Sequence, residues 1–168
     1  MPVPEAHLAA IAGGVLAQRV WPRTLPVRRG VRYLLGWPLL VFGGGIIVRA
    51  VSTAGRADLS ATDRLLTDGP YARSRHPMYL AWTLLHLGIG LVGGSRWVLL
   101  SWVPAAAAVH REALREERAL RQRFGSAFDR YAAAVPRYLP LRPSPRGLDQ
   151  LRSVLDHGPV IASRTALW

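Results

Sequence analysis

Two segments of this 168-residue chain carry residue types that can grip a small charged molecule. The first segment, residues 68–79, reads DGPYARSRHPMY. Pro77 suits the first position of a helix, because its missing N–H is not needed there. The N–H groups of a helix start attract a carboxylate, Arg75 can add paired hydrogen bonds, and Tyr71 and Tyr79 offer aromatic faces to a cation. The same residues also fit an ordinary helix start at a membrane surface.

The second segment, residues 111–140, carries the adjacent acids Glu116 and Glu117. Neighbouring residues point about 100° apart on a helix, so the two carboxylates cannot face the same partner. Glu117 can pair with Arg121 on a solvated face. Alternatively, one glutamate turns inward and accepts from an ammonium group or from ribose hydroxyls. The end of the segment is expected to return to the membrane surface and bring Arg137 near the first segment.

The composition favours a membrane protein with basic loops. Half of the residues are hydrophobic although the formal charge is +12, and the Arg residues lie between apolar stretches that nearly lack charge. There is no cysteine, which excludes disulfides, thiolate metal sites and cysteine nucleophiles. No metal site is predicted. Nucleic-acid binding is not expected either, because the Arg-rich helix is interleaved with Glu residues and continues from a membrane span.

Four apolar stretches predict an all-α, integral-membrane helical bundle of about four transmembrane helices. They cover residues 3–17, 33–48, 78–94 and 97–109. Each is shorter than the roughly 20 residues that comfortably span a bilayer, so the helices must extend past their apolar limits. The first stretch is weaker because Gln18 and Arg19 interrupt it, and it either spans the membrane or lies in the interface.

Glycines punctuate the predicted helices. Those in the second and third stretches are expected to let helices approach closely. Residues 93–95 should make a tight break, so that the third and fourth stretches form an antiparallel hairpin. The fourth helix then runs on past His110 as a cytoplasmic C-terminal helical extension, which Gly125 can stop.

The chain divides into a membrane domain and a tail, and arginine placement predicts how the domain is oriented. The membrane domain covers residues 1–140, with binding segments 69–79 and 112–140, and the Pro- and Arg-rich tail covers 141–168. One face of a four-span arrangement receives six Arg, at positions 19, 23, 28, 29, 32 and 96. The other receives Arg at 49, 56, 64, 73 and 75 and the eleven from 111 to 164. The second face is expected to be cytoplasmic, with both termini, at a bacterial inner (plasma) membrane.

In order and spacing, the two segments resemble the membrane methyltransferases that include isoprenylcysteine carboxyl methyltransferases and phospholipid N-methyltransferases. The resemblance covers roughly residues 31–140. The matching pieces are Gly69-Pro70-Tyr71, Arg75-His76-Pro77-Met78-Tyr79, the Glu116-Glu117 pair followed by Leu120, Phe124-Gly125, Tyr131, and Val135-Pro136-Arg137 running to Pro140. Phe128 stands where many relatives carry Tyr, so no hydroxyl role is expected there.

The resemblance implies that one end of the helical bundle encloses S-adenosylmethionine at the cytoplasmic edge of the membrane. It implies a cofactor-binding set of Tyr71, Arg75, His76, Pro77, Tyr79, Glu116 and Glu117. Arg75 and Arg137 become the catalytic candidates, with Arg137 the best placed to contact an anionic group of the acceptor. Methyl transfer is an in-line displacement, so the main task of the protein is to align the acceptor and exclude water.

The methyl acceptor is expected to be lipophilic or lipid-modified and to enter sideways from the membrane lipid. The Arg75 and Arg137 pair favours a carboxylate of the isoprenylcysteine type. A phospholipid amine or a small thiol is the alternative, and an amine would need a base such as His76, His86 or His110. His86 lies inside an apolar stretch and is expected to be buried, neutral and hydrogen-bonded. A non-enzymatic protein that binds anionic lipid or a partner is the remaining alternative. The sequence does not indicate an oligomeric state.

Overall fold

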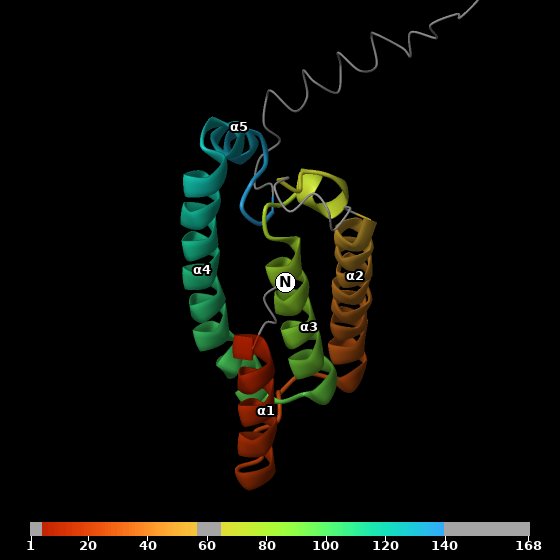
Figure 1. The fold of residues 1–168 in the computed structure, drawn as a ribbon. Coiled ribbons are helices and arrows are strands. Elements are labelled where there is room, and N and C mark those ends of the chain that lie inside the picture. Colours follow the sequence, from red (N-terminus) through yellow and green to blue (C-terminus); the bar gives the residue numbers. More distant parts are fainter. Residues whose placement is uncertain (1–4, 57–64, 140–168) are drawn as a thin grey trace, which may run out of the picture.

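The computed structural model describes residues 5–56 and 65–139, and within them it contains helices and no strand (Figure 1). The all-α prediction is therefore confirmed for this part of the chain. In chain order the elements are α1 (Glu5–Val20), α2 (Arg29–Arg56), the short 3-10 helix η1 (Gly69–Ala72), α3 (Pro77–Gly93), α4 (Arg96–Phe124) and α5 (Ser126–Ala134). The 141–168 tail lies outside the described residues.

The hairpin between α3 and α4 has the predicted form. Gly94 ends α3 in the left-handed region, with φ +63°, where a residue without a Cβ is favoured. Ser95 then caps α4, because its Oγ accepts a hydrogen bond from the Val98 N–H at 3.2 Å. At the far end α4 stops at Gly125, whose φ is +51°. The long, uninterrupted fourth helix is therefore also confirmed.

The helices pack in neighbouring pairs, with α2 against α3, α1 against α4 and α3 against α4 (Figure 1). Glycine allows the first pair to touch through the backbone. A Cβ on Gly36 would lie 3.2 Å from the Gly88 oxygen, and one on Gly43 would lie 2.9 Å from the Ala81 oxygen. The expectation of glycine-mediated packing is confirmed for Gly36, Gly43 and Gly88, but not for Gly44 and Gly45, which have no neighbour within 4 Å of a built Cβ.

One helix of the described residues is both long and apolar enough to cross a membrane, the Arg29–Thr53 part of α2, with a mean hydropathy of 1.8 over its best window. Large apolar side chains on it point outward, among them Leu34, Trp37, Val41 and Phe42. Helix α3 is apolar but has 17 residues, and α1 has 16, or about 24 Å. By length and hydropathy together, the described residues contain one candidate span, and the four predicted spans are not confirmed.

The end of the bundle that holds the α3–α4 turn is tied together by the loop between α1 and α2. The Leu25 N–H donates to the Gly94 oxygen at 2.9 Å, and the Arg96 N–H donates to the Arg23 oxygen at 3.0 Å. The Trp97 indole N–H also donates to the Trp21 oxygen at 2.7 Å. These bonds fix the lower end of the bundle in Figure 1, opposite α5.

Candidate functional site

The two chemistry-bearing segments meet at the opposite end of the bundle, near α5 (Figure 1). The connection is made by the backbone. The Arg75 N–H donates to the Pro136 oxygen at 2.9 Å, and the His76 N–H donates to the Arg137 oxygen at 3.2 Å. Ser74 reinforces the junction, because its hydroxyl donates to the same Arg137 oxygen at 3.1 Å. The prediction that Arg137 returns to the first segment is confirmed.

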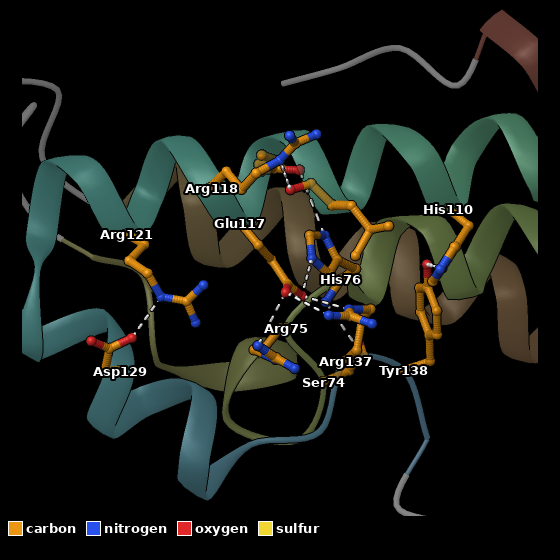
Figure 2. Close-up of polar contacts among 12 residues, drawn as sticks. Ser74, Arg75, His76, His110, Glu117, Arg118, Arg121, Asp129, Arg137 and Tyr138 are labelled. Carbon is orange, nitrogen blue, oxygen red and sulfur yellow. Dashed lines mark hydrogen bonds and ion pairs between the residues drawn. The ribbon is translucent and has the colours of Figure 1, made fainter.

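Glu117 is the centre of a buried ion-pair cluster (Figure 2). Its carboxylate accepts from Nε and Nη2 of Arg137, both at 2.8 Å, in the paired geometry that suits a guanidinium. Nη1 of Arg75 lies 3.4 Å away and Nε2 of His76 lies 3.1 Å away. Burial raises the pKa of Glu117, but the Arg137 hydrogen bonds and the charges of Arg75 and Arg137 outweigh it and lower the pKa to about 2.

Glu116, the neighbouring acid, faces a different environment. Its side chain is 40% exposed, against 6% for Glu117. Its Oε2 accepts from the Tyr79 hydroxyl at 3.3 Å and lies 3.5 Å from Nδ1 of His76. The His76 and Tyr79 rings stack with 5.3 Å between their centroids. The angular separation expected of adjacent helical residues thus points one carboxylate into the cluster and leaves the other open to solvent.

An open pocket lies at the start of α3. It is a shallow pocket, open to solvent, with a cavity volume of about 40 Å³. Its lining residues come from η1, α3 and α4 and from the turn before α3: Tyr71, Arg75, His76, Pro77, Met78, Tyr79 and Glu116. Glu117 and Arg137 are not part of the lining.

Unused donors face this end of the fold. Among the described residues, the backbone N–H groups of Met78 and Tyr79, in the first turn of α3, form no hydrogen bond. Nε of Arg75 is buried and also lacks a partner. Donors of this kind, beside a helix start, can hold an anionic group.

Tyr71 is held in the pocket wall by α5. The Tyr131 hydroxyl donates to the Tyr71 backbone oxygen at 2.7 Å. Burial raises the pKa of Tyr131 to about 12, so its hydroxyl keeps the proton that this bond needs. On its other side η1 packs against the end of α2. Burial and the nearby Glu116 charge likewise raise the pKa of Tyr71.

The structure separates the predicted site residues into two groups. Six of the seven cofactor candidates line the pocket, whereas Glu117 and the catalytic candidate Arg137 pair behind it. The alternative pairing of Glu117 with Arg121 is wrong, because Arg121 bonds to Asp129 at 2.7 Å.

Three residues of this region were not singled out from the sequence. Ser74 ties the two segments together, Met78 lines the pocket, and the Tyr138 hydroxyl meets Nδ1 of His110 at 3.0 Å. Their types give no signal in isolation, since serine, methionine and tyrosine are common at helix starts and membrane surfaces. Phe128 is fully buried and lies against the Tyr131 ring, in keeping with the absence of a hydroxyl role.

The described residues thus form a helical bundle with one helix long and apolar enough to cross a membrane and, at one end, a pocket lined by charged and aromatic side chains. The family model of the phospholipid methyltransferases matches residues 31–127, more than half of the chain. The chain therefore belongs to this family of membrane methyltransferases, and the resemblance read from the sequence is confirmed. No curated protein and no solved structure matches the chain. The matched range contains the whole pocket lining, whereas Tyr131 and Arg137 lie beyond it.

Proposed function

We propose that this chain is an integral-membrane methyltransferase that uses S-adenosylmethionine and methylates a lipophilic acceptor. The observation that carries the proposal is the pocket at the start of α3, where a partly exposed carboxylate, two tyrosines and unbonded amides surround one space. Membership of the phospholipid methyltransferase family supports the reaction class. It also weighs against a purely lipid-binding or partner-binding role.

The residues around the pocket fit the charged groups of S-adenosylmethionine. The Met78 and Tyr79 amides and the unpartnered Nε of Arg75 suit its carboxylate. The Glu116 carboxylate suits its ammonium group, and the Tyr71 ring suits the sulfonium. When bound, the cofactor supplies a methyl group on a sulfonium that can leave as a neutral thioether.

Glu117 and Arg137 lie outside the pocket lining and hold the segments that carry the lining residues. Their paired hydrogen bonds hold the 135–139 segment against α4, and the Pro136 and Arg137 oxygens fix the turn that carries Arg75 and His76. We therefore assign Arg137 a positioning role instead of the acceptor contact expected from the sequence. Arg75 stays a pocket residue, with one face on Glu117 and one toward the cofactor.

The charge balance of the pocket favours an amine acceptor, such as a phospholipid headgroup. The expectation of a carboxylate depended on Arg75 and Arg137 being free, yet Nη1 of Arg75 and the Arg137 fork are both paired with Glu117. The partly exposed charge in the pocket is instead Glu116. An ammonium must lose a proton before its lone pair can form the new C–N bond. Both ring nitrogens of His76 already face carboxylates, so the proton passes to Glu116 or to water in the open pocket.

We further propose that the pocket end of the bundle faces the cytoplasm of a bacterial cell and that both termini lie there. This orientation is supported by the arginines of α4 and α5 from Arg111 onward, which gather at the pocket end, whereas Arg96 lies at the other end. The acceptor then reaches the pocket sideways from the lipid, and the cofactor reaches it from water.

Two measurements test the proposal. Calorimetry on detergent-purified protein should show saturable binding of S-adenosylmethionine and of its demethylated product, lost in Arg75→Ala but kept in Arg115→Ala, an exposed arginine on the outer face of α4. Absence of binding to folded wild-type protein contradicts the proposal.

Transfer of labelled methyl groups should then be compared among proteoliposomes that contain phosphatidylethanolamine, a prenylated cysteine or a hydrophobic thiol. Labelling of the phospholipid alone is the expected result. Labelling of the prenylated cysteine alone would restore the carboxylate assignment.

A further inference from the structure

Two histidines meet inside the apolar bundle, away from the pocket. His7 of α1 and His86 of α3 are both 0% exposed, and their Nδ1 atoms lie 3.0 Å apart. From α4, the Val98 oxygen lies 2.8 Å and the Ser101 hydroxyl 3.2 Å from Nε2 of His86. The prediction of a buried, hydrogen-bonded His86 is confirmed, whereas His7 was not predicted to be its partner. Ionisable side chains buried among apolar helices are energetically costly, and inside membrane proteins they usually mark a function.

The hydrogen bonds determine where the protons of this pair lie. The Val98 oxygen can only accept, so Nε2 of His86 carries a proton, and Nδ1 of neutral His86 is bare. Nδ1 of His7 must then donate to it, which leaves Nε2 of His7 without a proton. That Nε2 is buried and has no partner among the described residues. In the neutral pair, the remaining three ring nitrogens therefore all have hydrogen-bond partners.

A further proton can enter only at Nε2 of His7, whichever ring then carries the charge. Among residues 5–56 and 65–139, the new N–H would face no acceptor. The other polar groups at the pair are the Ser101 hydroxyl and the Val98 oxygen, and neither can take up the positive charge. Tyr79 of α3 and Tyr138 are the titratable side chains of the buried cluster against which Ala6, the residue before His7, packs. Protonation of the pair therefore opposes the docking of α1, because it buries a charge without a counter-charge.

Helix α1 is linked to the pocket by Ala6, the residue before His7. Ala6 packs against a buried cluster formed by Tyr79, Val109 and Ala113. Tyr79 lines the pocket with its other face, where its hydroxyl donates to Glu116. Further along α1, Gly14 lies so close to α4 that a Cβ there would come within 2.8 Å of the Val98 Cα. The histidine pair therefore sits between the glycine contact and the support of Tyr79.

We propose that His7 and His86 form a proton-sensitive positioning pair: the neutral pair docks the start of α1 so that Ala6 supports Tyr79, and protonation releases it. The part that concerns the pocket rests on the function proposed above. The docking of α1 is a property of the apo-protein and can be tested without the cofactor.

Because the chain has no cysteine, a single introduced thiol reports this docking. We would place it at Ala6→Cys and compare it with Ala133→Cys, an exposed position on α5 that corrects for the pH dependence of thiol chemistry. Near pH 7.5 a water-soluble maleimide should modify Cys at position 6 at least about tenfold more slowly, because a docked segment is open in about 10% of molecules or fewer. Near pH 5, at the acid end of the range of histidine titration, the two relative rates should converge.

The matched variant is His7→Asn, whose amide can still donate to Nδ1 of His86 but cannot take up a proton. Protection at position 6 should then persist at both pH values. In the wild type, S-adenosylmethionine should bind more weakly near pH 5 than near pH 7.5, and this difference should be smaller in His7→Asn. An unchanged protection ratio in wild-type background between the two pH values overturns the proposal, and so does an acid-induced loss that survives in His7→Asn. Failure of cofactor binding with the protection step intact would contradict the proposed function alone.

Discussion

At the C-terminal end of α3 the chain satisfies its own backbone groups, whereas at the N-terminal end several polar groups still point into a pocket. Gly94 closes the C-terminal end with a left-handed turn, and its oxygen accepts from Leu25. At the other end Pro77 needs no partner, the Met78 and Tyr79 amides have none, and Glu116 is partly exposed. Within the described part of the chain, Nε of Arg32, beside Gly94, is also buried without a partner, but only at the N-terminal end do open donors and a partly exposed carboxylate surround a pocket.

At the pocket end, the two adjacent glutamates have different environments and different roles. Glu117 is closed off by two arginines and a histidine, and Glu116 faces the pocket. If this division is correct, changes at Glu117 should alter stability together with binding, changes at Glu116 should alter binding alone, and changes at Gly94 should alter stability alone.

The largest effect is expected for Glu117→Ala. It leaves the largely buried Arg75 guanidinium and the partly exposed Arg137 guanidinium without their counter-charge. The cost should approach the value of about 3–5 kcal/mol for a fully buried pair, and for the solvent-screened Arg137 fall below it. The thermal unfolding midpoint in detergent should fall and S-adenosylmethionine binding should be lost. Glu117→Gln is the control, because it keeps the shape and part of the hydrogen bonding and should fall in between. A Glu117→Ala protein as stable as wild type would show that the cluster does not hold the pocket wall.

The next effect is a pH dependence of stability that belongs to Glu117. Its pKa is lowered from 4.5 to about 2 in the folded protein, so the unfolded chain binds the proton more readily. The stabilisation is complete above about pH 4.5 and is lost as the pH falls toward 2. The stability difference between wild type and Glu117→Gln should therefore shrink between pH 5 and pH 3 in thermal unfolding experiments. A difference that stays constant over this range would refute the assignment.

A smaller effect, confined to affinity, is expected for Glu116→Gln. A charge-assisted hydrogen bond is worth about 1.5–3 kcal/mol, so S-adenosylmethionine should bind roughly 10- to 100-fold more weakly by calorimetry. The unfolding midpoint should stay close to that of wild type, because the side chain is 40% exposed. Equal losses of stability in Glu116→Gln and Glu117→Gln would remove the distinction between the two acids.

The smallest effect is expected at the closed end. Gly94→Ala places a Cβ on a left-handed residue with φ +63°, at a cost of about 1 kcal/mol, and this Cβ would also overlap the Arg32 guanidinium, which must move aside. Stability should fall by this amount while the calorimetric affinity for S-adenosylmethionine stays unchanged, since the pocket lies at the other end of α3. A parallel fall in affinity would indicate that the two ends of the helix are coupled.

Much of the fold could be predicted because local rules decide it. Pro77 begins α3, Gly94 ends it, Ser95 starts the next helix and Gly125 stops it, and each acts through its own backbone geometry. Apolar stretches located the helices for the same reason. The prediction of four membrane spans is not confirmed, because helices α1 and α3 are shorter than the roughly 20 residues that a bilayer requires.

The sequence by itself determined which residue types are present at the site and that Glu116 and Glu117 must point apart, because helix geometry relates neighbours. Only the tertiary structure decided which glutamate turned inward, since that depends on Arg137 returning from 20 residues away. It alone also paired His7 with His86, which are 79 residues apart. Contacts between distant segments depend on the packing of whole helices, and no local pattern in the chain encodes them.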